Sequence, residues 1–447
     1  TAVVDRIRGQ RWGGLTRALF LNAASLMGTT VVTSMLGYVF WIIAARTYRP
    51  ADVGFAAAVI SALTFLAMLA KVGLGTLLIG ELRRYPGAEL RLIGAAAAVA
   101  GVVGVTLGAG FAVSAPHLSA ELEALAASPV AVLVFAVSVG VTALALVLDE
   151  AVVGLLRGGL QLARNVAMAV LKLAGLVLLA VIGGTIAARA IYLTWPVATA
   201  LSLALMAYRL RDLRGRAATP GHRGPEDRER EAATRLPFDR ATAWRAVLHH
   251  AVNFLGQAAG LVMPVLVVSL VSVTAGAYLF VAYTIASLLT AVSSALTTAL
   301  YATGAREPDA LHRQLSMSLG AALLSAVAGI VGVLLLGNLV LSAFGEGYSA
   351  EAGPVLRILV LGAIPIAIKT HFGAIARIRN QLGRASIIFA LGAALEIGLA
   401  GVGAQMAGLV GLATGWVIAL WLEGLVLLVP VLREAWPPWR APYGSRA

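Results

Sequence analysis

The sequence contains no cysteine and very little charge. Only 12% of its 447 residues are Asp, Glu, Lys or Arg, whereas soluble domains average about 25%. The absence of cysteine excludes disulfide bonds, thiolate metal sites and a cysteine nucleophile. The shortage of charge, beside 60% hydrophobic residues, indicates that most of the chain does not face water.

Apolar runs long enough to cross a bilayer recur along the whole chain. A transmembrane helix needs about 20 apolar residues, and a secretory signal would instead give one short run followed by polar sequence. The pattern predicts an all-α polytopic membrane protein with about twelve transmembrane helices, the first of them retained. These helices are expected near residues 19–45, 54–80, 91–114, 129–156, 165–186, 190–209, 246–271, 275–302, 315–343, 354–376, 385–404 and 407–432.

Basic residues divide unequally between the two sides of the predicted helices. With the N-terminus in the cytosol, 27 of the 34 Lys and Arg fall in cytosolic segments and 3 in external loops. This is the asymmetry expected of membrane proteins, whose cytosolic loops are enriched in Lys and Arg. We therefore expect both termini in the cytosol. We attribute the net charge of +13 to cytosolic loops that face anionic lipid, and not to binding of nucleic acid. The bias to Ala, Gly, Val and Arg, with only three lysines, indicates a GC-rich bacterial genome. The expected location is therefore a bacterial cytoplasmic (inner) membrane.

One long polar segment divides the chain into two halves. Residues 211–245 combine Pro-Gly pairs with a run of mixed charge, which is typical of a linker. The expected organisation is a six-helix bundle over 1–210, a basic cytosolic linker over 211–245, a second six-helix bundle over 246–432 and a cytosolic tail over 433–447. The two bundles are predicted to be pseudo-symmetric around a central cavity.

Polar side chains share one face on the first two helices of each half. At 100° per residue they fall within arcs of about 80–100°, which predicts a solvated cavity built from repeats. The alternative is that Ser and Thr bond their own helix backbone or a neighbouring helix. The predicted substrate-binding residues are Asn22, Ser25, Thr29, Ser61, Thr64, Lys71, Asn253, Gln257, Tyr283, Ser287 and, on helix 354–376, Lys369.

Besides Arg357, near the outer end of helix 354–376, seven charged residues lie inside the predicted helices. They are Lys71, Lys172, Lys369, Asp149, Glu150, Glu396 and Glu423. A lysine in the membrane costs about 2.5–3.5 kcal/mol even on the mild insertion scale, so each needs an explanation.

Two interpretations of these charges stay open. In the first they pair with one another, with Lys172 near Asp149 or Glu150 on the preceding helix, and with Glu396 and Glu423 near Lys369 or an arginine. In the second, Lys71 and Lys369 offer cations to an anionic headgroup, while Glu396 and Glu423 carry a coupling proton or sodium ion.

The sequence carries no motif for covalent chemistry. It has no Gly-rich phosphate loop ending in Lys-Ser/Thr, which excludes ATP hydrolysis by that route. His249 and His250 stand together without a nearby acidic or thiolate ligand, so no metal site is predicted, and no cofactor. The largest expected external loop, 115–128, is small for a glycosyltransferase or polymer ligase. We therefore expect a protein that is not an enzyme.

Several stretches of the chain carry a family resemblance. One runs from Ala44 to Phe55, with the sequence Ala-Ala-Arg-Thr-Tyr-Arg-Pro-Ala-Asp-Val-Gly-Phe. The others are Gly73 to Thr76, Arg164-Asn165 with Lys172, Ala275 to Tyr278, Leu341 to Gly345 with Tyr348, Leu356 to Leu359 with Pro365, Arg377, and Gly408 to Gly411. In order and spacing, over about 19–430, the chain resembles the polysaccharide and oligosaccharide flippases of the multidrug/oligosaccharidyl-lipid/polysaccharide exporter (MOP) superfamily.

The resemblance implies a flippase for cell-surface polysaccharide synthesis. Such a protein moves a saccharide linked to polyprenyl phosphate or pyrophosphate from the inner to the outer leaflet by alternating access. Its partners would be the lipid-linked saccharide, membrane lipids, and a glycan polymerase or glycosyltransferases. Lys71 would then meet phosphate, and the hydroxyl and amide faces would meet sugar.

Three other functions remain open at this point. The first is an ion-coupled drug or metabolite exporter of the same superfamily, whose cavity we expect to be acidic and aromatic. The second is a membrane enzyme of glycan assembly. The third is a scaffold that transports nothing, in which Lys71 would tolerate replacement by Leu.

Overall fold

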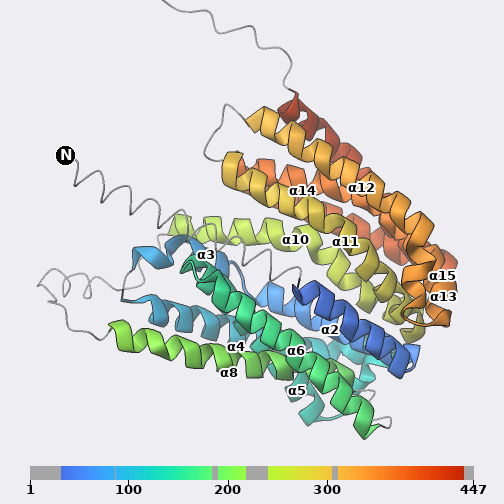
Figure 1. The fold of residues 1–447 in the computed structure, drawn as a ribbon, viewed down its shortest axis with the longest axis horizontal. Helices are drawn as coiled ribbons and strands as arrows, with labels where there is room; N and C mark the ends of the chain where they lie inside the picture. Colours follow the sequence, from blue (N-terminus) through green and yellow to red (C-terminus); the bar gives the residue numbers. More distant parts are fainter. Residues whose placement is uncertain (1–31, 86, 184–189, 218–239, 305–310, 437–447) are drawn as a thin grey trace, which may run out of the picture. The chain divides into compact units, whose positions relative to one another are not determined.

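Over the residues that the structure describes, every regular element of the chain is a helix. This computed structural model describes residues 32–85, 87–183, 190–217, 240–304 and 311–436, and every regular element in these ranges is helical (Figure 1). Ten of these helices have the length and hydropathy to cross a membrane, and the helix Val32–Thr47 is shorter. The predicted fold class, an all-α polytopic membrane protein, is confirmed.

The described helices group into two compact units. The first unit comprises Thr1–Trp41, Leu63–Pro116 and Glu123–His250, and the second comprises Ile42–Ala62, His117–Leu122 and Ala251–Ala447. Two helices, α2 (Pro50–Ala70) and α10 (Arg240–Leu270), are divided between the units. Most of the predicted linker, from 218 to 239, lies outside the described residues, so the predicted bundle boundaries stay a prediction.

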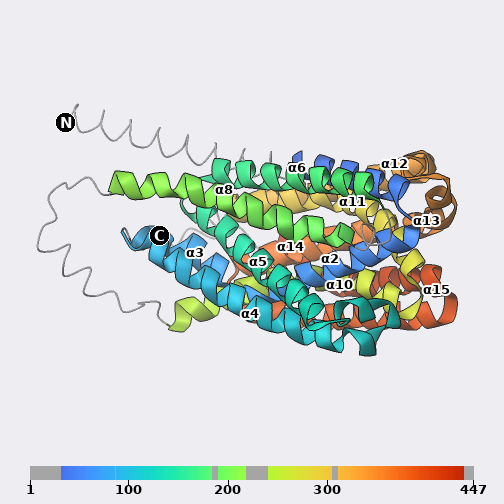
Figure 2. The ribbon, with the colours of Figure 1, turned by 90° about the horizontal axis from the view of Figure 1, so that it is seen from below.

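The first unit is built from helices that pack through small residues. Its α-helices are α3 (Leu74–Glu81), α4 (Glu89–Leu118), α5 (Pro129–Gly154), α6 (Gly158–Ile182) and α8 (Thr194–Ala217), with the 3-10 helices η1 (Leu82–Arg84), η2 (Ala120–Leu125) and η3 (Ala190–Leu193). Figure 2 shows α6 and α8 side by side. On α4, a Cβ added at Gly108 would lie 2.8 Å from the Cα of Ala136 on α5, so glycine permits this close approach.

The predicted helix 54–80 is interrupted, which corrects the sequence prediction. The chain leaves the helical path between α2 and α3, where Val72 and Gly73 have φ values of 43° and 82°. A Cβ at Gly73 would also lie 2.8 Å from the carbonyl oxygen of Ala246. The apolar run continues through this turn, so hydropathy alone gives no sign of the break. Lys71 therefore lies at the end of a helix, not in its middle.

The second unit adds α11 (Val273–Gly304), α12 (Leu311–Ser342), α13 (Glu346–Leu359), η5 (Val360–Gly362), α14 (Ala363–Ile378) and α15 (Leu382–Ala435). Its central helix is α14, which packs against α11, α12 and α15. Most residues of α14 between Ala363 and Ala376 are buried. A lysine on this helix is consequently placed in the interior of the unit.

The helix α15 is two antiparallel helices joined by a sharp turn. Its path breaks at Ala407 and Gly408, whose backbone angles are not helical. Beyond the turn the two arms touch through glycine, because a Cβ added at Gly403 would overlap the carbonyl oxygen of Gly411. The two arms correspond to the separate helices predicted over 385–404 and 407–432.

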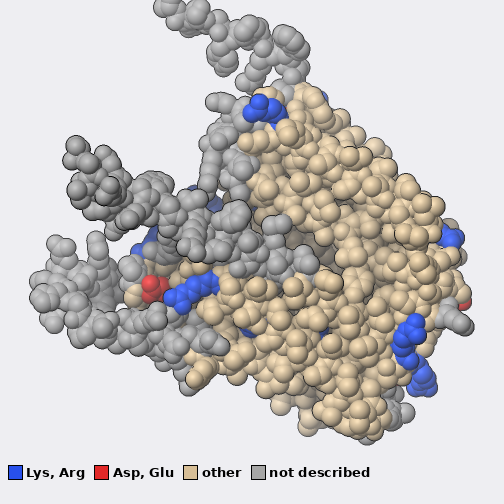
Figure 3. Space-filling view, in the orientation of Figure 1, with Lys and Arg blue, Asp and Glu red and all other residues tan. Residues whose placement is uncertain are grey.

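The outer surface agrees with a membrane environment. In the view of Figure 3, few Lys, Arg, Asp or Glu side chains interrupt the described surface. Large apolar side chains are exposed on it, including Val102, Leu324 and Leu335 at 67%, 72% and 77%. Such a surface is expected where side chains meet acyl chains, which offer no hydrogen bonds.

Candidate functional site

A cavity of about 400 Å³ lies inside the second unit. Helices α10, α11, α13, α14 and α15 form its walls, and its volume is in the range of small-molecule binding sites. The lining combines hydroxyls, amides, aromatic rings and charges. These polar and aromatic residues are Asn253, Gln257, Tyr283, Ser287, Thr290, Ser294, Thr297, Thr298, Lys369, Thr370, Arg377, Phe389, Glu396 and Trp416.

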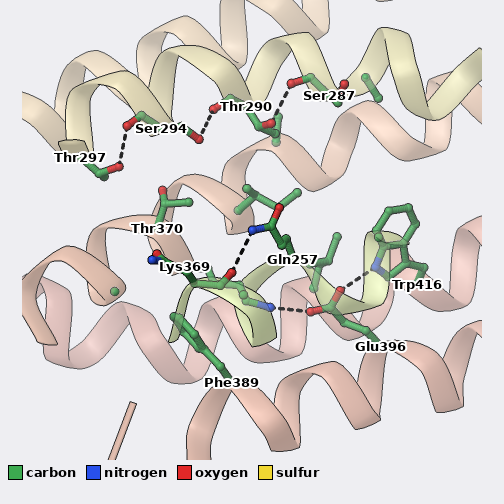
Figure 4. A pocket seen from close by; sticks show the side chains of 18 of the residues that line it. Gln257, Ser287, Thr290, Ser294, Thr297, Lys369, Thr370, Phe389, Glu396 and Trp416 are labelled. Atoms are coloured by element: carbon green, nitrogen blue, oxygen red, sulfur yellow. Dashed lines mark hydrogen bonds and ion pairs between the residues drawn. The ribbon is translucent and has the colours of Figure 1, made fainter. Parts of the chain in front are cut away.

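One wall of the cavity is a row of hydroxyls along α11 (Figure 4). Ser287, Thr290 and Ser294 follow one another at helical spacing. Each donates its hydroxyl proton to a carbonyl of its own helix, at 2.7, 2.7 and 3.1 Å respectively. A hydroxyl that has used its one proton still has lone pairs. This wall therefore accepts hydrogen bonds from an occupant and has few protons left to donate.

The facing wall on α10 carries two amides and two glycines. Gln257 donates to the backbone carbonyl of Asn253 at 3.0 Å, and the side-chain oxygen of Asn253 accepts from Arg377 on α14. Gly260 lies against Tyr283, whose hydroxyl would be only 2.6 Å from a Cβ at that position. Glycine at 260 thus allows Tyr283 to lie against α10 at the cavity wall.

A buried charge cluster closes one side of the cavity. The ammonium of Lys369 bonds Glu396 at 2.6 Å and Glu423 at 2.8 Å, and all three side chains are at most 6% exposed. The second oxygen of Glu396 accepts from the indole N–H of Trp416 at 2.7 Å. With both carboxylates ionised the cluster has a formal charge of −1. Among the described residues Oε1 of Glu423 has no hydrogen-bond partner, so one carboxylate oxygen is unsatisfied.

Aromatic rings surround this cluster. The rings of Tyr283 and Trp416 have centroids 5.4 Å apart, and Lys369 lies 5.4 Å from the ring centroid of Phe389. The indole of Trp416 both bonds Glu396 and lines the cavity. A molecule bound in the cavity would therefore contact a side chain that is bonded to the charge cluster. The cavity can therefore bind a ligand with both apolar and hydroxyl-bearing faces.

The structure brings together the predicted residues of the second half. Those that line the cavity are Asn253, Gln257, Tyr283, Ser287, Lys369 and Glu396, and Glu423 contacts Lys369 from behind. Asn22, Ser25 and Thr29 lie outside the described residues. Ser61 and Thr64 are on α2, and Ser61 is buried; they do not belong to this cavity.

Sequence reasoning missed Arg377 and Trp416 as lining residues. A signal for Arg377 was present, because Ile366, Lys369, Thr370, Gly373 and Arg377 follow the three-and-four spacing of one helix face. Trp416 gave no comparable signal, since its contact with Glu396 joins the two arms of α15.

In the first unit, Lys71 and Glu150 form an ion pair. Lys71 is buried, and Gly75, one turn beyond the helix break, leaves the space that Glu150 occupies. The cation predicted to meet a headgroup is thus already matched by a carboxylate in this conformation.

The predicted pairing of Lys172 with Asp149 or Glu150 is wrong. Asp149 instead bonds Arg164, through Nε at 2.7 Å and through Nη2, and it also accepts from Asn165 at 3.2 Å. Lys172 is two turns, or about 12 Å, beyond Arg164 on α6, too far along the helix to reach Asp149 at the end of α5.

Lys172 lies among aromatic rings. It is 95% buried, with Nζ 3.7 Å from the ring centroid of Trp195 and 5.5 Å from that of Phe40. This is the geometry of a cation–π interaction. No carboxylate of the described residues is within ion-pair distance of it.

Comparison with known proteins gives one family match over part of the chain. Residues 19–223 match the family model described as "Polysaccharide biosynthesis protein". No curated protein matches the sequence.

Solved structures share the fold over nearly the whole chain. A multidrug resistance MATE family transporter of the MOP superfamily, in an inward-facing conformation, is 15% identical with a TM-score of 0.62, over 90% of this chain and 94% of that one. The lipid II flippase MurJ, in an inward closed conformation, is 11% identical with a TM-score of 0.64, over 93% and 90%. A MOP superfamily transporter from Pyrococcus furiosus, described as having a binding pocket of reverse polarity, is 15% identical with a TM-score of 0.59, over 94% and 95%.

Proposed function

We propose, from the polysaccharide flippase and exporter family that these matches support, that this chain flips a lipid-linked saccharide across the membrane. The lipid would be a polyprenyl phosphate or pyrophosphate, and the direction from the inner to the outer leaflet. The chain would work in the cytoplasmic membrane of a bacterium with both termini in the cytosol. Transport needs no covalent step, so no cofactor or catalytic residue enters the proposal.

The observation that carries this proposal is the composition of the cavity wall in the second unit. A row of hydroxyl acceptors on α11 faces Gln257 on α10 (Figure 4). The rings of Tyr283 and Trp416 lie against each other in the same lining. Sugars present many hydroxyl donors on a ring with apolar faces, and such a wall complements them. A cavity for organic cations would instead need an unpaired carboxylate in its lining, whereas the carboxylate that lines this cavity, Glu396, is bonded to Lys369.

The buried cluster of Lys369, Glu396 and Glu423 is the proposed coupling site. Its formal charge of −1 becomes zero when a proton or a sodium ion binds. Because Trp416 lines the cavity and also donates to Glu396, an occupant that moves the indole changes the surroundings of the carboxylate. Ion binding and saccharide binding would then be linked through one side chain.

Reconstitution tests the function. Proteoliposomes are loaded with a labelled polyprenyl-pyrophosphate disaccharide, and its arrival in the opposite leaflet is followed by an enzyme that cleaves only exposed glycan. We expect protein-dependent translocation that protein-free liposomes lack. Export of a cationic dye with no movement of the disaccharide would favour the drug-exporter alternative. Sugar transfer onto the lipid without translocation would favour the membrane enzyme.

A further inference from the structure

We propose that Arg377 and Asn253 bind the phosphate group of the substrate in this cavity. The ligand is a phosphate or pyrophosphate joined to a polyprenyl chain. The inference rests on the proposed flippase function and specifies which residues recognise the anion. It replaces the sequence-based assignment of that role to Lys71 and Lys369.

The buried lysines are already engaged. Lys71 is paired with Glu150, and Lys369 contacts two carboxylates at 2.6 and 2.8 Å. A phosphate at either lysine would face those carboxylates and have to displace them. Lys172 is 95% buried against Trp195 and does not line the cavity.

Arg377 differs from these lysines in its surroundings. It lines the cavity and is half-buried, and its bonded partner is the neutral amide of Asn253. In the part of the chain that the structure describes, no carboxylate is within ion-pair distance of Arg377. Its positive charge is therefore available to an anion.

The remaining hydrogen-bonding groups of this pair are mainly donors. A guanidinium has five N–H groups in a fork that matches phosphate, and Asn253 takes up one of its nitrogens. Because the amide oxygen of Asn253 accepts from Arg377, its NH₂ group is the part left for a ligand. The pair thus contrasts with the α11 wall, where the hydroxyls mainly offer lone pairs.

The donors at Arg377 and Asn253 and the acceptors on α11 would orient the bound substrate in the cavity. Arg377 is in the last turn of α14, eight residues beyond Lys369, and eight helical residues span about 12 Å. The phosphate would bind at the Arg377 end, and the first sugar would lie toward Tyr283 and Trp416. Gly256 and Gly373 line the cavity beside the pair, so no side chain at these two positions competes for the space.

Binding measurements on the detergent-purified full chain test this assignment. Three probes are compared by calorimetry, namely farnesyl pyrophosphate, farnesol and inorganic pyrophosphate. The parent should bind farnesyl pyrophosphate at least about tenfold more tightly than either of the others. Arg377→Gln should weaken farnesyl pyrophosphate binding about 10- to 100-fold, as expected for lost charge-assisted bonds, and leave farnesol binding unchanged. Arg377→Lys should restore part of the loss.

Arg379→Gln is the matched control. Arg379 is two residues away, exposed, and paired with Glu434, so its loss should leave all three affinities unchanged. Size-exclusion and thermal-unfolding profiles of the variants verify that each one is folded.

Three results would overturn the inference. One is an Arg377→Gln variant that keeps the parent's preference for pyrophosphate over farnesol. Another is equal binding of inorganic and farnesyl pyrophosphate, which would indicate a site for a free anion. The third is loss of the preference in Lys369→Gln with Arg377→Gln unaffected. If the parent translocates the disaccharide in proteoliposomes and any of these results is found, only the anion site fails. If the parent does not translocate it, the flippase proposal fails.

Discussion

Lys71 and Lys172 are both buried lysines, yet their surroundings are opposite. Lys71 has a carboxylate partner in Glu150, and Lys172 has aromatic rings. Their sequence contexts are similarly apolar, so the sequence predicts that both are special without revealing which one is paired. Which partner each lysine meets depends on how far along its helix it lies relative to the groups on neighbouring helices. That relation is a tertiary property.

Replacing Lys71 should destabilise the protein because it leaves the half-buried Glu150 without a counter-ion. For Lys71→Leu we expect a loss of about 3 kcal/mol, the usual cost of breaking a buried pair from one side. The double variant Lys71→Leu with Glu150→Leu should recover most of that loss. Thermal or denaturant unfolding in detergent, arranged as a double-mutant cycle, measures the coupling. Independent, additive effects of the two substitutions would contradict the pairing.

Helix α15 shows what periodicity and hydropathy can predict at the scale of an element. Two apolar runs separated near Gly408 predict two helices, and the structure breaks the helix there. The break between α2 and α3 was missed, because it depends on left-handed backbone at Val72 and Gly73 and on contact with Ala246. A helix break that leaves the run of apolar residues uninterrupted cannot be recognised from the hydropathy of the sequence.

The hairpin in α15 should be sensitive to side-chain size at its glycine contacts. In Gly403→Ala the added methyl group meets the backbone of Gly411, so we expect destabilisation of about 1–3 kcal/mol from overpacking. Gly398, on the same arm, has open space around its Cβ position. Gly398→Ala should be neutral or stabilising by up to about 1 kcal/mol. Unfolding midpoints compare the two, and equal midpoints would argue against close packing of the arms.

The cavity lining divides in the same way between what periodicity predicts and what it misses. The polar faces of α10 and α11 follow from 3.6-residue periodicity, and they place Asn253, Gln257, Tyr283 and Ser287 on the cavity wall. The pairing of Lys369 with Glu396 and Glu423 was one of two interpretations that the sequence left open, and the structure confirms it. Periodicity could not choose between the two, because these residues come from α14 and from both arms of α15. Helix faces are local properties, whereas charge partners depend on packing between helices.

For the whole molecule, the predicted fold class is confirmed, the family model matches residues 19–223, and the substrate remains our proposal. The match over residues 19–223 and the MOP-superfamily folds agree with the resemblance carried by the sequence. The central cavity between two six-helix bundles stays a prediction, because the described cavity lies within the second unit alone.

Ion coupling is a property of the whole molecule because it links the charge cluster to transport. Glu423→Gln leaves Lys369 and Glu396 as a balanced pair, so the fold should persist while the site for the coupling ion is lost. In proteoliposomes we expect translocation that no longer responds to an imposed pH or sodium gradient. Glu434→Gln, at an exposed carboxylate paired with Arg379, is the control and should keep the parent's response. A Glu423→Gln variant that still responds to both gradients would exclude this cluster as the coupling site.

The central claim is that the cavity of the second unit holds the saccharide, and a matched pair of double variants tests it most directly. Gln257→Leu with Thr290→Val removes an amide and a hydroxyl from the cavity wall. Gln405→Leu with Thr414→Val makes the same changes at exposed positions on α15, where Thr414 also bonds its own helix. The measurement is the initial rate at which proteoliposomes flip the lipid-linked disaccharide. We predict about a tenfold fall for the cavity pair and the parent's rate for the exposed pair. Equal rates for the two double variants would contradict the account.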